Sequence, residues 1–202
     1  MRPRRLLMAA ALLLAPAACS RPSTPERTQA VAAFATVQRV FQHPRCQNCH
    51  ILGDAPLQFD AGVPHALGVT RGPAGHGAPG LPCATCHSES NPPASYGPNA
   101  PPGAPHWGLP PPDHKMAWFG LSPAALCEMV KDKGRNGGRA FAALIAHVSE
   151  DKLVLWGWNP GGERAPVSVP HDEFVVKFKQ WAAPEGRVRA TSLRPWRART
   201  AR

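Results

Sequence analysis

Cysteine and histidine are scarce in this chain of 202 residues, which holds 6 of the first and 9 of the second. Chance is therefore not expected to place them in one close pattern twice. Long apolar runs are also missing, since the run from Leu6 to Ala15 falls well short of the roughly 20 residues that span a bilayer. The glycine-rich residues 136–139 lack the lysine and the spacing of a phosphate-binding loop, so a turn between helices accounts for them better.

A five-residue signature, Cys-x-x-Cys-His, nevertheless occurs twice. Motif 1 is Cys46-Gln47-Asn48-Cys49-His50, and motif 2 is Cys83-Ala84-Thr85-Cys86-His87. Chance would place only about 0.01 such pentads in a chain of this composition. Two thiols one helical turn apart can bond to the two vinyl groups of one haem, while the adjacent imidazole binds the iron. The sequence therefore predicts two haem c groups, with His50 and His87 as proximal ligands.

The paired cysteines also fit two kinds of site that hold no haem. The two Cys-x-x-Cys pairs could supply four thiolates to a tetrahedral zinc ion. Each pair could instead form a disulfide in an exported protein. Neither a zinc site nor a disulfide requires a histidine directly after each second cysteine, whereas haem attachment accounts for both histidines.

The N-terminus has the layout of a bacterial secretion signal over residues 1–18, with arginines first and an apolar run after them. Two outcomes fit the end of this run: cleavage after small residues, or lipidation of Cys19 as the first residue of a lipoprotein. Pro16 stands where a lipobox normally has an aliphatic residue. Both outcomes predict a periplasmic chain, either free or anchored to the membrane. Bacteria attach haem covalently in that compartment, so the signal and the haem motifs support each other.

The net charge of +10 would suggest a nucleic-acid partner if it were spread over the chain. It is instead concentrated at the two ends, and between Pro22 and Gly186 the basic and acidic residues cancel, thirteen of each. Residues 185–202 form a basic tail that we expect to be disordered. Its arginines are Arg187, Arg189, Arg194, Arg197, Arg199 and Arg202. No nucleic-acid partner is predicted.

The rest of the chain predicts one mainly α-helical domain over residues 25–184, with long loops rich in proline and glycine. Only 32 residues separate His50 from Cys83, too few for two self-contained single-haem domains. We therefore expect a single dihaem cytochrome c-like domain. Helices are expected from Pro25 to the His43-Pro44 pair, from Ser122-Pro123 to Gly134, from about Gly138 past Val148, and from about His171 to Pro184, with a buried extended segment at residues 153–158.

The second axial ligand of each haem decides between electron transfer and reaction at an open iron. Met116 follows a proline-rich stretch that resembles the loop offering a distal methionine in class I cytochromes c. His65, in the loop between the motifs, and His147, beside the apolar face of a helix, are the other two candidates. His43 lies too close to Cys46 to reach the opposite face, so we interpret it as a structural contact.

Several stretches together carry a resemblance to a known family: the two motifs, residues 43–46, residues 136–139 and the Trp156–Gly161 stretch. From about Ala35 to Trp181 the chain resembles exported dihaem c-type cytochromes commonly labelled isoquinoline 1-oxidoreductase subunit. The resemblance implies a redox partner, such as a molybdenum-containing hydroxylase that would supply electrons bound for the respiratory chain. Nothing in the sequence would bind molybdopterin or an isoquinoline, so any such activity would belong to the partner.

The leading hypothesis is a dihaem c-type cytochrome that transfers electrons in the periplasm, and that acts as a carrier or subunit more than as a catalyst by itself. The alternative is a dihaem peroxidase with one open haem iron. A haem-based gas sensor ranks last because the sequence offers no effector domain.

Overall fold

The computed structural model of this protein describes residues 24–192, so the predicted signal, Cys19 and residues 193–202 of the basic tail lie outside the described residues. The described chain is mainly helical with long irregular stretches, as the sequence predicted. Its helices are α1 (Pro25–Phe41), α2 (Pro44–Gln47), α3 (Pro123–Lys131), α4 (Phe141–Glu150), α5 (Lys152–Trp156) and α6 (His171–Ser192). None of these described helices combines the length and the hydrophobicity of a membrane span.

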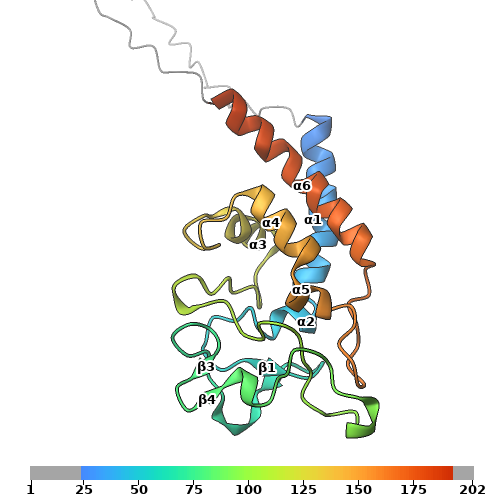
Figure 1. Cartoon of the computed structure of the whole chain (residues 1–202). Coiled ribbons are helices and arrows are strands. Elements are labelled where there is room, and N and C mark those ends of the chain that lie inside the picture. The colour runs from blue at the N-terminus through green and yellow to red at the C-terminus, as the bar shows by residue number, and fades with distance from the viewer. Residues whose placement is uncertain (1–23, 193–202) are drawn as a thin grey trace, which may run out of the picture.

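The longer helices gather at one end of the molecule, where α1 lies beside α6 (Figure 1). Aromatic rings fill the contact: Phe34 meets Trp181 with ring centroids 5.0 Å apart, and Phe41 meets Phe174 at 5.9 Å. Burying each such side chain contributes about 1.5–3 kcal/mol. Phe41 is the last residue of α1, so this core also fixes the point where the chain enters motif 1.

The short helix α2 leads directly into motif 1. His43 caps it, because its Nδ1 accepts a hydrogen bond from the backbone N–H of Arg45 at 3.2 Å, and Pro44 occupies the first helical position. His43 is thus a structural contact, as predicted. Burial lowers the pKa of His43, and the positive charge of Arg45 lowers it further, so the ring is neutral and able to accept this bond.

The loop-rich end of the molecule holds two small antiparallel hairpins. Strand β1 (Leu57–Gln58) pairs with β2 (Val63–Pro64), and β3 (Gly77–Ala78) pairs with β4 (Leu81–Pro82). Two-stranded sheets of this length have little stability of their own. Contacts with the rest of the chain must therefore hold them, and β4 ends directly before motif 2.

Helices α3 and α4 follow the sequence prediction with shifted ends. Ser122 caps α3 by accepting from the N–H of Ala125 at 3.3 Å, as predicted. The helix ends at Lys131, and α4 begins at Phe141 where we expected it near Gly138. Gly137 and Gly138 have φ of 71° and 77°, a left-handed backbone that cannot continue a right-handed helix. The predicted turn between helices is present there.

The prediction of a buried extended segment at residues 153–158 is wrong, because the chain forms α5 instead. Asp151 supplies the start signal: its carboxylate accepts from the N–H groups of Leu153 at 2.9 Å and Val154 at 3.3 Å. No residue of α5 is fully buried. A short apolar run does not by itself distinguish a strand from a short helix, and here the cap decides.

We predict that Asp151→Ala lowers the free energy of unfolding by about 1 kcal/mol, because the first N–H groups of α5 lose their acceptor. Asp151→Asn is the matched control, since an asparagine side chain caps equally well and changes only the charge. Its free energy of unfolding should stay within about 0.5 kcal/mol of the original protein's. Urea denaturation followed by circular dichroism measures both. Equal losses in the two variants would contradict the capping role.

The last helix also differs from its prediction, because α6 continues past Pro184 to Ser192. Proline removes one intrahelical hydrogen bond and usually ends or kinks a helix. Good helix formers surround it here, with Ala182 and Ala183 before it and Glu185 after it. The first part of the predicted tail, residues 185–192, is therefore helical.

Candidate haem-binding sites

Motif 1 and motif 2 adopt the same backbone turn, although one continues α2 and the other follows β4. In motif 1 the amides of Cys49 and His50 donate to the carbonyl oxygen of Cys46 at 3.2 and 3.1 Å. In motif 2 the amides of the second cysteine and of the histidine donate to the carbonyl oxygen of Cys83 at 3.1 and 2.9 Å. A helical turn of this kind presents positions i, i+3 and i+4 on one side. This turn lets each motif present two thiols and one imidazole to one haem, and in motif 2 all three line one cavity.

The two motif histidines are oriented in the same manner. Nδ1 of His50 lies 2.9 Å from the carbonyl oxygen of Met116, and Nδ1 of His87 lies 2.7 Å from that of Pro102. A carbonyl oxygen only accepts, so in each ring Nδ1 carries the proton and donates. Nε2 keeps its lone pair and is the nitrogen available to a metal.

A tryptophan stacks on each of these imidazoles. Trp118 lies on His50 with ring centroids 3.5 Å apart and an angle of 3° between the planes. Trp107 lies on His87 at 4.3 Å and 6°. The carbonyl and the tryptophan together fix the ring of each histidine, which is the kind of support that metal-binding histidines receive from their surroundings. The sequence predicted tryptophans that pack on haem or core, but not this pairing.

Burial keeps both motif imidazoles and the two thiols of motif 1 uncharged. It lowers the pKa of His50 to about 3 and also lowers the pKa of His87. It raises the pKa of the Cys46 thiol to about 12 and that of Cys49 to about 11. Both imidazoles are therefore neutral at neutral pH, the form that binds iron, and the two thiols of motif 1 are protonated.

Neither zinc nor disulfide formation gains support from this arrangement. Among the described residues, no three Cys, His, Asp or Glu side chains are grouped as they would have to be to hold a metal ion. A structural zinc needs four such donors. None of the five described cysteines, which include Cys127 of α3, is bonded in a disulfide.

A partly open cavity lies against motif 2, and both motifs contribute to its wall. Cys49 of motif 1 lines it together with the thiols and imidazole of motif 2. Apolar side chains form much of the rest: Leu57, Phe59, Leu67, Val69, Leu81, Trp107, Leu109 and Trp156. Cys49 and Cys83, one cysteine from each motif, thus border the same space. The two motifs are therefore neighbours in the fold.

Two arginines stand in the wall of this cavity, Arg45 and Arg164. Arg45 is buried, forms an ion pair with Asp60, and places its guanidinium 5.7 Å from the ring centroid of Trp156. Its Nε–H is buried and has no hydrogen-bond partner in the protein. Arg164 donates to the carbonyl oxygen of Ala100. Two guanidinium groups beside one carboxylate leave an excess positive charge at the rim of an apolar space.

The three candidate distal ligands have different surroundings. His65 lines the cavity of motif 2, and its ring centroid lies 6.2 Å from that of His87. His147 is close enough to His50 for its charge to lower the pKa of that ring, after the larger effect of burial. Its Nδ1 pairs with Asp151 at 3.2 Å. Met116 is buried in the core, and its carbonyl lies on the Nδ1 side of His50, away from Nε2.

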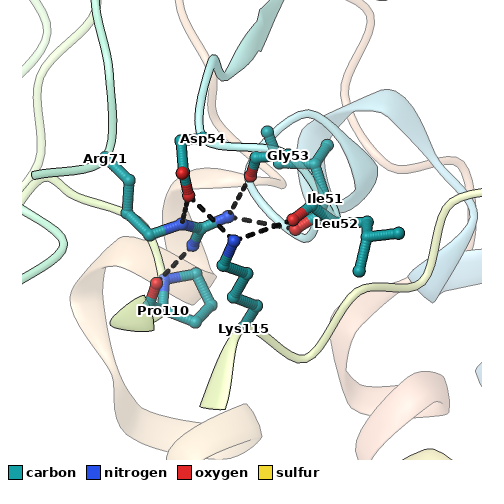
Figure 2. A network of polar contacts seen from close by, with 7 residues as sticks. All are labelled: Ile51, Leu52, Gly53, Asp54, Arg71, Pro110 and Lys115. Atoms are coloured by element: carbon teal, nitrogen blue, oxygen red, sulfur yellow. Dashed lines mark hydrogen bonds and ion pairs between the residues drawn. The ribbon is translucent and has the colours of Figure 1, made fainter. Parts of the chain in front are cut away.

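A buried arginine that sequence reasoning missed holds the loops around motif 1 in place (Figure 2). Arg71 has no exposed surface and donates to the carbonyl oxygens of Ile51 at 3.0 Å, Gly53 at 2.9 Å and Pro110. Its Nε pairs with Asp54 at 3.3 Å. One side chain thus joins the segment that directly follows motif 1 to the proline-rich stretch.

Lys115 reinforces this junction from the proline-rich side. Its ammonium group donates to the carbonyl oxygen of Leu52 at 3.0 Å and pairs with Asp54 at 2.9 Å (Figure 2). Met116 comes next and has a positive φ of 48°. That conformation costs a non-glycine residue about 1 kcal/mol. Met116 is also the residue whose carbonyl oxygen orients His50. Backbone strain of this kind is often found at functional sites.

The donor side chains of both motifs fit a covalently held haem, and at motif 2 the surrounding cavity fits one as well. Each motif offers two thiols and a neutral, oriented imidazole, and the cavity offers apolar walls, excess positive charge for propionates and an unpaired buried N–H. Arg139 does not line this cavity and donates to the carbonyl oxygen of Asn136 at 3.2 Å within the turn. Comparison of the chain with protein-family models, with curated proteins and with solved structures finds no match.

Proposed function

We propose that this chain is a dihaem c-type cytochrome that transfers electrons in the bacterial periplasm. The observation that carries the proposal is the equivalence of the two motifs. Both have the same turn, the same Nδ1–H bond to a carbonyl oxygen and the same stacked tryptophan. Different segments of the chain provide the carbonyl and the tryptophan at each motif. A shared requirement, an oriented Nε2 beside two thiols, explains why both motifs have the same contacts.

In this function Cys46 and Cys49 would form the thioether bonds of one haem, with His50 as the proximal ligand. The cysteines of motif 2 and His87 would hold the other. A covalently attached haem supplies a one-electron couple between ferric and ferrous iron. The protein's own contribution is to exclude water, to fix the two imidazoles, and to surround each site with apolar groups that set its reduction potential.

The arrangement of the two proposed haem sites would allow electron transfer between them and to a partner protein. Cys49 and Cys83 line one cavity, so the two redox groups would share a wall. Cys86 is exposed at the surface, on the same cavity. We infer that a redox protein docks over motif 2. A molybdenum-containing oxidoreductase, the partner that the sequence resemblance implies, is the first one to test.

The proposal predicts that mature protein from a host able to assemble cytochromes c is red and carries two haems. Intact mass should equal the polypeptide plus two haem groups, and the pyridine haemochrome spectrum should give the same stoichiometry. Cys127→Ser is the control, because this thiol belongs to neither motif, and it should keep both haems. A colourless product with the mass of the polypeptide alone would contradict the proposal.

Peroxide distinguishes the electron carrier from a peroxidase. A carrier is expected to hold two low-spin irons whose spectra ignore added peroxide. A persistent high-spin iron with peroxide turnover would instead favour the peroxidase.

A further inference from the structure

His65 faces His87 across the cavity of motif 2. The ring centroids lie 6.2 Å apart, and the planes are inclined by 64°. Two imidazoles that bind one metal through bonds of about 2 Å each place their centroids roughly 6 Å apart. The separation of the two rings therefore matches a single metal ion between them.

Both rings also offer the same nitrogen. Nδ1 of His65 lies 2.9 Å from the carbonyl oxygen of Ala66, so it carries the proton and donates, as Nδ1 of His87 does to Pro102. Nε2 is therefore the nitrogen that each ring can offer to a metal. Two imidazoles that offer Nε2 on one cavity are the donor set of a six-coordinate haem iron.

No other described residue of this cavity competes with His65. The lining holds two histidines, His65 and His87, and no methionine. His76 is nearby in sequence, but its Nδ1 faces the carbonyl oxygen of Trp107 at 3.2 Å and it does not line the cavity. Met116, the other kind of ligand that the sequence suggested, lies in the hydrophobic core beside His50.

Two backbone hydrogen bonds hold the hairpin that carries His65. The N–H of His65 donates to the carbonyl oxygen of Pro56 at 2.9 Å, which extends the β1–β2 pairing by one bond. The N–H of Leu57, in the other strand, donates to the carbonyl oxygen of Asn48 at 2.9 Å. The hairpin thus anchors His65 to motif 1. The β1–β2 hairpin, which has little stability of its own, would thus position His65.

We propose that His65 is the second axial ligand of the iron held by His87, so that the haem of motif 2 is six-coordinate and low-spin. This assignment rests on the proposed function, since it requires a haem at motif 2. It makes this site an electron-transfer centre without an open coordination position, and it leaves any open iron to motif 1.

The test compares His65→Ala and His65→Met with the original holoprotein by electron paramagnetic resonance and optical spectroscopy. The alanine variant should convert one iron per chain from low-spin to high-spin, and added imidazole should restore the low-spin state. The methionine variant should stay low-spin with a raised reduction potential, because a His/Met pair favours ferrous iron over a His/His pair. His114→Ala is the matched control, because His114 pairs with Asp113 and does not line the cavity, and it should change neither spectrum.

Haem stoichiometry separates the two proposals. If His65→Ala carries two haems by mass and its spin state equals that of the original protein, His65 is not the ligand, and the proposed function stands. If the original protein carries no haem, both proposals fall. If the alanine variant cannot be purified, unchanged spin state and potential in the methionine variant would overturn the assignment equally well.

Discussion

Replacing both Cys83 and Cys86 by alanine is expected to lower the haem content from two to one per chain. Motif 2 lies in the loop-rich end of the molecule, between β4 and a long irregular stretch. Motif 1 follows α1 and α2, and Cys46 packs against the aromatic core. The helical core does not depend on motif 2, so the variant should fold and should still attach a haem at motif 1.

Intact mass and the pyridine haemochrome spectrum measure this loss directly. The reciprocal variant, Cys46→Ala with Cys49→Ala, should lose the other haem and also unfold at lower denaturant concentration, because Cys46 packs against the aromatic core between the helices, whereas Cys83 is buried outside that cluster. Cys127→Ala serves as the control for removing a thiol and should retain two haems. Two haems in the variant without the motif 2 cysteines, or none, would contradict independent attachment at the two motifs.

Local signals made the helical part of this fold predictable. The Ser122-Pro123 pair gave the start of α3, and the two glycines at 137 and 138 marked the turn before α4. The errors came where a local signal had two meanings. The apolar run after Asp151 fits a strand or a capped helix. A proline usually ends a helix, but α6 continues past Pro184.

The candidate sites were predictable only as far as residues close in sequence determine them. The motifs alone name both pairs of thiols and the two histidines that we propose as proximal ligands. The partners of those histidines come from distant segments: Met116 is 66 residues from His50, and Trp107 lies across a proline-rich loop from His87. No spacing rule connects such positions. His65 could be named as a candidate from the sequence, but only the fold places it opposite one particular ring.

The irregular half of the molecule lacks regular backbone hydrogen bonds, so side chains must satisfy its buried carbonyl groups. Arg71 does this for three of them at once. Its sequence context, a single arginine before a glycine, carries no signal for such a role. Gly72 shows how tight the junction is, since a Cβ there would overlap the carbonyl oxygen of Gly77.

Arg71→Leu is therefore expected to lower the free energy of unfolding by about 3–5 kcal/mol. Leucine removes the donors of three carbonyl groups and leaves those carbonyls buried, at a cost of roughly 1–3 kcal/mol each before any water enters. Asp54 loses one partner but is 60% exposed and keeps Lys115, so it adds little. Urea denaturation of the holoprotein, followed by circular dichroism, measures the change.

The control for Arg71→Leu is Arg135→Leu. Arg135 is 60% exposed and pairs with Asp132 across a solvated turn, so its loss should cost no more than about 0.5 kcal/mol. Arg71→Lys tests the geometry: an ammonium group keeps the charge but cannot reach three carbonyl oxygens in different directions, and it should recover only part of the stability. A loss in Arg71→Leu no greater than that in Arg135→Leu would mean that the loops around motif 1 are held by something other than this guanidinium.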